Sequence, residues 1–358
     1  MNIIITAPSL NPKLNVSGIS SVAQFIIKKN KAHHYIHFQI GKTDEENGGI
    51  VRILSILGSY FKWLYLLLTT SDKIVHYNFP LDTKAILRDC PLIILTRLMN
   101  VKLLIHIHGG AFIQRDDIPN WAQLFLKITL NGKNPILVLG DTEKENLIEK
   151  FGCKNVFVLP NSIDLDDATS FSRKPFTINN HLKFLFLGRI SKPKGLEYIY
   201  LAFKELKKNH QIDFKFYLAG KGEDEKEYVE KFNHLLGDDF IFKGVVFGTQ
   251  KEDLLKETNI FLLPSFYEGL PISLLEAMAY AQVPICTNVG SIKYIVEDNI
   301  NGLFIGVKSK DDIVYKILKV QNDISKINVL GLKAKETVFN KYNPDAYIQN
   351  LNSYYNYE

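Results

Sequence analysis

The chain has 358 residues, of which 46% are hydrophobic and 23% charged; this excludes a disordered or fibrous protein and favours two globular domains. Three well-separated cysteines, Cys90, Cys153 and Cys286, argue against a disulfide framework or a zinc site and favour reduced thiols in the cytoplasm. Residues 1–115 carry 13 Lys and Arg against 6 Asp and Glu, within a net charge of +5, which favours an anionic partner or surface. Nucleic acid is a weak candidate, because no zinc-finger, RNA-recognition or basic-helix pattern accompanies this charge.

The first half of the chain alternates strand-like and helix-like runs. Its first run lacks the basic region and cleavage site of a signal peptide and is typical of a buried strand. Such alternation predicts βαβ units and a parallel sheet. The expected strands are residues 2–8, 73–79, 101–109, 135–140 and 155–160, and the expected helices are residues 20–30, 84–98 and 142–152.

Residues 51–70 predict a strongly apolar helix with one polar stripe. Arg52, Ser55, Ser59 and Lys62 recur at spacings of three and four, and the other faces are mostly Ile, Leu, Phe, Trp and Tyr. The charges and the short length argue against a membrane-spanning helix. Two interpretations remain open. Residues 51–68 lie in a membrane interface, or the helix packs into its domain with a narrow solvated edge.

A second α/β series follows a polar stretch. Strands are expected at residues 183–190, 214–220, 239–246, 259–265 and 283–290, with helices between them. The predicted organisation is an N-terminal domain (1–170), a linker (171–180), a second domain (181–340) and a terminal helix (341–358) that packs back on the N-terminal domain. Both domains are predicted to be doubly wound and Rossmann-like, facing one another across a cleft that is the default ligand site.

Residues 266–290 contain two glutamates on either side of a Gly-Leu-Pro break. Pro271 suits the first turn of a helix, so we expect Glu268 in the loop after a strand and Glu276 inside the helix. The free N–H groups of the helix start are a potential anion site between them. Both carboxylates could therefore grip a ligand with hydroxyl groups at two ends and phosphate in the middle. On spacing alone, a dipole-complementing Glu276 and a turn-capping Glu268 are the favoured interpretation.

Two further features lie at expected strand ends, and several weaker candidates lie elsewhere. Gly188 ends a strand before the cations Arg189, Lys192 and Lys194, which could hold a diphosphate or form a solvated basic loop. His108 follows a strand beside two glycines and would face the cleft, whereas His106 is expected to be structural. Gly18, Asn161, Gly220 and Gly222 are weaker candidates, and Asp164 and Asp166 form an Asp-x-Asp triplet that chance explains best.

Together these motifs resemble the retaining GT-B glycosyltransferases of glycosyltransferase family four (glycosyl transferases group 1). The resemblance covers nearly the whole chain and is strongest in the Glu268, seven residues, Glu276 motif. It implies that Glu276 holds the ribose of a nucleotide-sugar donor, that Arg189 and Lys194 neutralise its diphosphate, and that no metal or other cofactor is needed. The implied catalytic residues are His108, Glu268, Arg189 and Lys194, and the implied donor-binding residues are Gly18, Gly188, Arg189, Lys194, Gly220, Glu268, Gly269, Leu270, Ile272, Ser273 and Glu276.

The function implied by the resemblance is transfer of a hexose-type sugar to a glycan acceptor. The basic, aromatic first third favours a polyprenyl-diphosphate-linked acceptor at the inner face of the plasma membrane, in the synthesis of capsule, O-antigen or exopolysaccharide. The enzyme is then expected to be cytoplasmic and peripheral to the membrane. A nucleotide-sugar epimerase of the same fold and a non-catalytic sugar-nucleotide-binding subunit are alternatives, and a soluble acceptor such as starch or sucrose is disfavoured.

Overall fold

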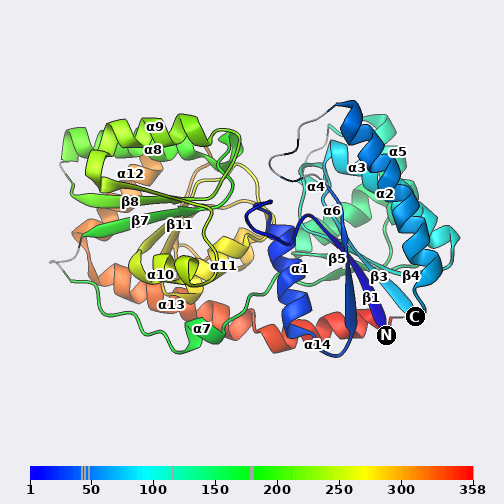
Figure 1. Cartoon of the computed structure of the whole chain (residues 1–358). Coiled ribbons are helices and arrows are strands. Elements are labelled where there is room, and N and C mark those ends of the chain that lie inside the picture. Colours follow the sequence, from blue (N-terminus) through cyan, green and yellow to red (C-terminus); the bar gives the residue numbers. More distant parts are fainter. Residues whose placement is uncertain are drawn as a thin grey trace. The chain divides into compact units, whose positions relative to one another are not determined.

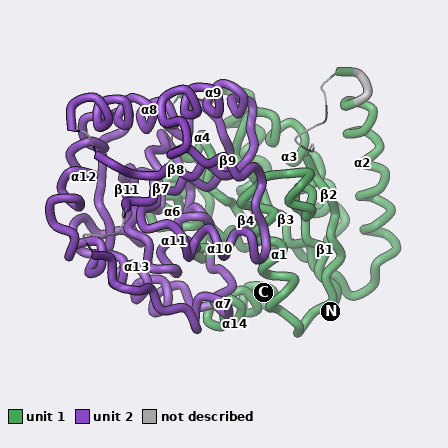
Figure 2. The backbone as a smooth tube through the Cα atoms, turned by 60° about the vertical axis from the view of Figure 1, so that its left-hand side comes forward, with its two compact units in different colours: residues 1–161, 344–358 green, residues 162–343 purple. Residues whose placement is uncertain are grey.

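A computed structural model describes residues 1–41, 43, 46, 49–114, 117–177, 181–210 and 212–357. The chain divides into two compact units, shown in green and purple in Figure 2. Unit 1 is Met1–Asn161 with Pro344–Glu358, and unit 2 is Ser162–Asn343. Each unit holds one six-stranded sheet with helices on both faces (Figure 1). The predicted α/β fold with two doubly wound parallel sheets is therefore confirmed.

The sheet of unit 1 has the order β2-β1-β3-β4-β5-β6, and all its strand pairs are parallel. Buried Ile, Leu and Val fill residues 3–5 and 136–138 and most of residues 103–107, as a sheet covered on both faces requires. The order reverses between β1 and β3, which are neighbours although β2 lies between them in the chain. The strands are β1 Asn2–Ala7, β2 His34–Gln39, β3 Lys73–Phe79, β4 Lys102–Ile107, β5 Ile136–Val138 and β6 Val156–Val158.

The helices of unit 1 include one from the far end of the chain. Helix α14 (Pro344–Tyr355) belongs to this unit and packs on α1 (Gly18–Lys29). Helix α3 contacts both α2 and α5, so these three helices form one layer. The remaining helices are α2 Ile50–Thr69, α3 Thr83–Leu98, α4 Ala111–Gln114, α5 Asn120–Leu130 and α6 Asp141–Phe151.

The sheet of unit 2 has the order β12-β11-β10-β7-β8-β9, again with parallel pairing throughout. Its core is rich in phenylalanine, with Phe184, Phe203, Phe214, Phe216 and Phe232 all fully buried. The order reverses between β7 and β10. The strands are β7 Leu182–Leu187, β8 Phe214–Ala219, β9 Phe240–Gly244, β10 Ile260–Leu263, β11 Val283–Thr287 and β12 Leu303–Ile305.

Helices connect these strands in the right order for a doubly wound sheet. Helix α11 (Ile272–Ala279) links β10 to β11 and packs against α13. The α-helices are α7 Asp166–Thr169, α8 Leu196–Glu205, α9 Glu225–Leu236, α10 Thr249–Glu257, α12 Lys310–Asn322 and α13 Ser325–Lys341. Short helical segments are η1 Lys192–Lys194, η2 Leu206–His210, η3 Gly237–Asp239 and η4 Gly290–Tyr294.

The polar stretch expected as a linker lies within unit 2. The structure divides the chain after Asn161 rather than at residue 170. The Arg173 guanidinium donates hydrogen bonds to the backbone carbonyls of Leu255, Lys256 and Tyr280. Phe176 is buried in the core of unit 2, and its backbone exchanges two hydrogen bonds with the Asn328 side chain. Residues 171–177 are therefore attached to unit 2, and residues 178–180 lie outside the described residues.

No helix in the described part of the chain is long and apolar enough to cross a membrane. The three cysteines are buried and unpaired.

Candidate functional site

The carboxyl ends of β7 and β10 meet where the strand order of unit 2 reverses. Ligands in open parallel sheets bind beyond the strand ends at such a reversal. The loop after β7 carries Gly188, Arg189 and Lys194, and the loop after β10 carries Glu268. Direct pairing of β7 with β10 through Phe184 and Leu185 brings these two loops together. The predicted donor-binding residues of unit 2 are therefore gathered at one edge of its sheet.

Glu268 is the anchor between the two loops. Its Oε1 accepts hydrogen bonds from Lys194 Nζ at 2.6 Å and from Ser265 Oγ at 2.7 Å. The Glu268 side chain is 9% exposed and the Lys194 side chain 26%. Removing one partner of so enclosed a pair leaves the other charge desolvated, which costs more than the pair itself contributes. Sequence reasoning named both charged residues but missed both their pairing and Ser265.

Glu276 forms a second carboxylate–lysine pair. It lies in the second turn of α11, where its Oε1 is 2.5 Å from Lys251 Nζ on α10. The Glu276 side chain is 17% exposed, whereas its helix neighbours Leu275 and Ala277 are buried. The carboxylate therefore points out of the core at the rim of the site. Lys251 was missed because nothing in the sequence relates a cation in one helix to a carboxylate in another.

The start of α11 lies between the two carboxylates. Pro271 is the N-cap residue, and no side chain caps this end of the helix. The N–H groups of Ile272 and Ser273 consequently have no acceptor within the helix and lie at its positive dipole end, whereas those of Leu274 and Leu275 donate to the Pro271 carbonyl. Leu270 is buried, so only its backbone could face a ligand. This end of α11 can accept an anion such as a phosphate.

Contacts with β11 and η4 hold the loop that carries Glu268 in place. Thr287 Oγ1 donates to the Ser265 carbonyl at 2.6 Å, and Ser291 N donates to the Gly269 carbonyl at 3.1 Å. A Cβ at Gly290 would stand 1.9 Å from the Glu268 carbonyl oxygen, so the loop packs directly on this glycine. The Glu268 carboxylate is thus held by both its side-chain partners and its backbone.

Gly188 and Gly220 lie against one another at the ends of β7 and β8. Gly188 N donates to the Ala219 carbonyl at 3.0 Å. Gly220 has a φ of +135°, and a Cβ there would stand 1.8 Å from the Gly188 carbonyl oxygen. A Cβ at Gly188 itself would meet nothing within 4 Å. The two glycines therefore differ: Gly220 is needed for close packing, whereas the space beside Gly188 is open.

His108 follows β4 in unit 1, and its hydrogen bonds determine which ring nitrogen carries the proton. Asn78 Nδ2 donates to the Thr6 carbonyl at 2.7 Å, which leaves Asn78 Oδ1 as an acceptor. His108 Nε2 lies 2.6 Å from that oxygen and must donate to it, so Nδ1 carries the lone pair. Burial lowers the pKa of His108 to about 3, although hydrogen bonding to the Asn161 side chain acts to raise it. His108 is a neutral base with a defined tautomer.

Gly18 is the first residue of α1, close to the strand-order reversal of unit 1. The N-cap side chain of Ser17 accepts a hydrogen bond from Ser20 N at 3.5 Å. A Cβ at Gly18 would meet nothing within 4 Å, so the space in front of this helix start is open. Gly18 and His108 belong to unit 1 and the carboxylates to unit 2, so their joint action remains a prediction.

Two other sequence features have structural roles. Asp166 N donates to Asp164 Oδ1 at 3.2 Å, which makes the Asp-x-Asp triplet the turn that opens α7. His76 and His106 are buried in the sheet of unit 1 and stack on one another. Within the described ranges, no group of three or more His, Cys, Asp or Glu side chains could hold a metal ion.

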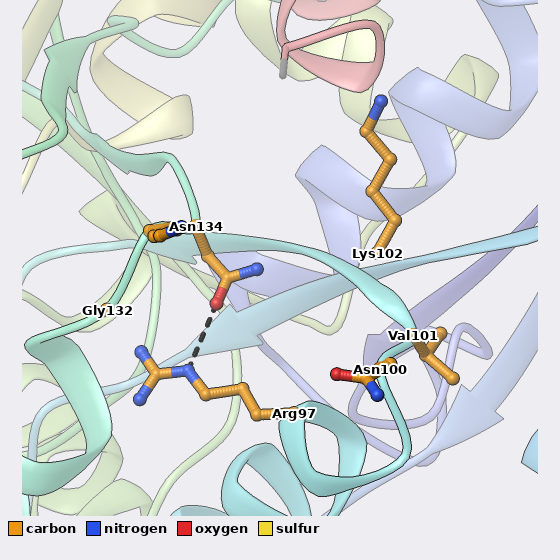
Figure 3. A pocket seen from close by; sticks show the side chains of 7 residues that line it. Arg97, Asn100, Val101, Lys102, Gly132 and Asn134 are labelled. Carbon is orange, nitrogen blue, oxygen red and sulfur yellow. Dashed lines mark hydrogen bonds between the residues drawn. The ribbon is translucent and has the colours of Figure 1, made fainter.

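Figure 3 shows a pocket of about 390 Å³ at the amino-terminal end of β4. Arg97 Nε donates to Asn134 Oδ1 at 3.0 Å beside Gly132, and Asn100, Val101 and Lys102 complete much of the wall. Strand order places ligand sites at the opposite, carboxyl-terminal end of a parallel sheet. We therefore assign no role in the candidate site to this pocket.

Comparison with known proteins agrees with this geometry. Residues 167–337 match the family described as Glycosyl transferases group 1. An Escherichia coli UDP-Gal:alpha-D-GlcNAc-diphosphoundecaprenol alpha-1,3-galactosyltransferase is 24% identical over 269 residues, which cover 70% of this chain and 68% of that protein. Across eight curated relatives, the matched segment spans 43% to 68% of the relative's own length.

Several solved structures cover 99% of this chain, and two of them serve as examples. Sucrose-phosphate synthase from Thermosynechococcus elongatus superposes with a TM-score of 0.79 at 16% identity, covering 99% of this chain and 98% of that one. Anabaena HepE in complex with UDP-glucose gives a TM-score of 0.74 at 14% identity, with the same coverage of 99% and 98%. At these identities the likeness establishes the GT-B fold.

Proposed function

Residues 167–337 match the glycosyl transferases group 1 family, and we propose that the chain is a retaining glycosyltransferase of this family. It moves a hexose-type sugar from a nucleotide-sugar donor to a glycan acceptor carried on a lipid diphosphate. The observation that carries the proposal is the pair of lysine-bound carboxylates, Glu268 and Glu276, on either side of the α11 helix start. One donor molecule with a sugar, a diphosphate and a ribose matches these three features in order.

Glu276 accepts hydrogen bonds from the ribose hydroxyl groups in this proposal. Lys251 holds the carboxylate at the rim of the site before the donor arrives. Glu268 contacts the donor sugar, while backbone amides from Gly269 to Ser273 line the sugar and the phosphates. The open space beside Gly188 and the close Gly188–Gly220 contact allow the donor to approach the backbone at the end of β7.

Cleavage of the sugar–phosphate bond develops negative charge on the leaving diphosphate. Lys194, Arg189 and the start of α11 stabilise that charge, and each such preorganised group is commonly worth about 3 kcal/mol of barrier. Lys194 exchanges its Glu268 partner for the diphosphate as the donor binds, so its charge stays paired. The leaving phosphate helps to deprotonate the acceptor in a front-face displacement, and the family resemblance assigns neutral His108 of unit 1 to the reacting carbon.

The donor is proposed to be a UDP-sugar and the acceptor a glycan on a polyprenyl diphosphate. The first is supported by the fold shared with HepE, which was solved with UDP-glucose, and the second by the named acceptor of the Escherichia coli relative. The basic residues 1–115 suit a diphosphate-linked substrate. Synthesis of a cell-surface polysaccharide at the cytoplasmic membrane face is the corresponding role.

A thermal-shift screen against UDP-, GDP-, ADP- and dTDP-sugars tests the donor site. A donor at about 100 times its dissociation constant should add about 2.7 kcal/mol to the free energy of unfolding. Glu276→Gln should abolish this shift. The neutral amide is a weaker acceptor of hydrogen bonds from the ribose hydroxyl groups than the carboxylate, and it leaves Lys251 without an anionic partner. Glu336→Gln, at an exposed lysine-paired glutamate on α13, is the matched control and should keep it.

Transfer itself is measured by UDP release in the presence of a GlcNAc-diphosphate-lipid acceptor. Lys194→Met should lower kcat by about 100-fold or more, because it removes charge from the leaving diphosphate. If no nucleotide sugar stabilises the protein, the donor site is refuted. If a donor binds and only its sugar is epimerised, or no product forms with any acceptor, the epimerase or non-catalytic alternative replaces transfer.

A further inference from the structure

We propose that the outer surface of helices α2, α3 and α5 is a membrane-docking face for anionic lipid. We call this surface the apolar face, and it consists of the exposed side chains of these three helices. The proposal goes beyond sugar transfer and names a second function of unit 1. It can be tested without donor or acceptor, so its failure and the failure of the proposed activity are separate results.

The first observation is the number of apolar side chains that these helices expose. Of the 24 exposed large hydrophobic side chains in the part of the chain that the structure describes, seven are on α2, two on α3 and four on α5. Phe61 is 75% exposed, Tyr65 69% and Leu68 67%, and Leu98 on α3 is 76% exposed. Soluble proteins rarely expose apolar side chains in such a contiguous group without a binding role.

The helices lie side by side, so their exposed side chains share one surface. Helix α3 contacts α2 on one side and α5 on the other, and the three run along the same flank of unit 1 in Figure 1. Helix α5 contributes Trp121, Leu124, Phe125 and Ile128.

Helix α2 exposes large apolar side chains, whereas a typical surface helix exposes polar ones. Trp63 and Leu67 fix it in the core of unit 1. Its polar stripe of Arg52, Ser55, Ser59 and Lys62 lines a pocket of about 380 Å³ together with residues 37–41, Arg88 and Glu46, which pairs with Arg52 at 3.1 Å. The apolar side chains are consequently left on the outside. A narrow solvated edge on an otherwise packed helix, one of the two interpretations of the sequence, is not what the structure has.

The charged residues beside the apolar face favour an anionic partner. Helices α2 and α5 contain no Asp or Glu, and the single acid of α3, Asp89, is fully buried and bound to Arg88. Lys62, Lys84 and Lys127 on the same helices are exposed. Cations beside an apolar face match an anionic lipid surface, where side chains such as Phe and Leu enter the acyl boundary and lysines contact the headgroups. A symmetric dimer through this face would instead bring like cations together.

Vesicle binding, followed by the fluorescence of Trp121, tests the proposal. The chain has two tryptophans, of which Trp63 is fully buried and bound to Thr96 Oγ1, while Trp121 lies on the apolar face and is 38% exposed. The full chain should co-sediment with phosphatidylethanolamine–phosphatidylglycerol vesicles, and its tryptophan emission should shift to the blue. Trp121→Phe should remove the shift but keep the co-sedimentation.

Two pairs of variants separate the apolar and the ionic contributions. Phe61→Ser with Leu124→Ser should weaken vesicle binding at least about tenfold, because two large apolar side chains no longer enter the lipid. The matched control, Val329→Ser with Leu332→Ser, changes side chains that are 57% and 55% exposed on α13 of unit 2 and should bind as the native chain does. Lys62→Ala with Lys127→Ala should weaken binding to anionic vesicles about 25-fold and leave binding to phosphatidylcholine vesicles unchanged.

Circular dichroism and thermal denaturation without ligand establish that each variant is folded. The proposal is overturned if the native chain binds no vesicle, or if the Phe61–Leu124 variant binds as well as the α13 control. It is also overturned if sedimentation equilibrium finds a dimer that the Phe61–Leu124 variant dissociates, since the apolar face would then join two copies of the chain.

Discussion

At the scale of the residue, three histidines in unit 1 are held neutral and oriented. Tyr35 donates a hydrogen bond to the Tyr355 hydroxyl, which leaves the Tyr355 proton for His76 Nδ1 at 2.7 Å. His76 Nε2 must then donate to His106 Nδ1 at 3.2 Å, so both rings carry their proton on Nε2. Burial lowers the pKa of His76 to about 3 and that of His106 well below its usual value of 6.5. The neutral ring of His106 packs against that of His108, with centroids 4.1 Å apart.

Nitrogen NMR of ¹⁵N-histidine-labelled protein should find all three rings neutral and protonated on Nε2 from about pH 8 to about pH 5. Because the folded-state pKa values lie below 6.5, the unfolded chain takes up these protons first. The stabilisation that these neutral rings contribute to the folded protein is therefore fully present above about pH 6.5. It is lost as the pH falls towards about 3.

Tyr355→Phe supplies the control for this prediction. It removes the donor to His76 Nδ1, so the His76 signal should become a mixture of tautomers. His108 should keep its tautomer, because Asn78 alone determines it. A protonated ring at any of the three positions at about pH 5.5 would contradict the prediction.

At the scale of the element, the donor site depends on how closely the ends of β7 and β8 approach. Gly220→Ala should lower the free energy of unfolding by at least about 2 kcal/mol, because the new Cβ meets the Gly188 carbonyl and φ is +135°. Gly188→Ala is the matched control and should change stability by less than about 1 kcal/mol, since its Cβ enters open space. Urea unfolding compares the two variants, and equal midpoints would refute the close approach.

Most elements of both sheets were predictable because their signals are local. The run of buried strand residues before Pro271 and the apolar Leu274, Leu275 and Met278 after it specify a strand, a loop and a helix in that order, and α11 begins at Ile272. Strand β2 was not predicted, because its alternating His34, Tyr35 and His37 lack the apolar run of a central strand. It lies at the edge of its sheet and pairs only with β1 among the described strands.

At the scale of the whole molecule, the last helix completes the first unit. Tyr347, Leu351 and Tyr355 of α14 are buried there, and Asn30 Nδ2 donates to Asn352 Oδ1 at 2.7 Å. Each of the three buried side chains is worth about 1.5–3 kcal/mol on burial, so α14 is a major source of stability for unit 1. The chain therefore passes through unit 2 before unit 1 is complete.

Truncation after Asn343 should loosen unit 1 selectively. Hydrogen exchange followed by mass spectrometry should show faster exchange in α1, β1 and β3, which lie beneath or beside α14, and no change in β7, β8 and β10. Truncation after Tyr355 keeps the buried residues of α14 and should exchange nearly as the native chain does. Equal acceleration in both units would contradict the assignment of α14 to unit 1.

The sequence by itself determined the class of fold and the carboxylate motif and predicted the family, because alternating strands and helices, the Pro271 break and the Glu268–Glu276 spacing are all encoded within a few tens of residues. The partners of those carboxylates were decided by tertiary structure. Lys194 lies 74 residues from Glu268, and Lys251 lies on a different helix from Glu276. Tyr355 orients His76 across 279 residues.

The same distinction applies to α2. Periodicity shows which residues share a face of a helix, but only packing decides which face is covered. Trp63 and Leu67 take the core, the polar stripe lines a pocket, and Phe61 and Tyr65 are left exposed. Contacts between distant segments depend on where the chain folds back on itself, and local patterns do not contain that information.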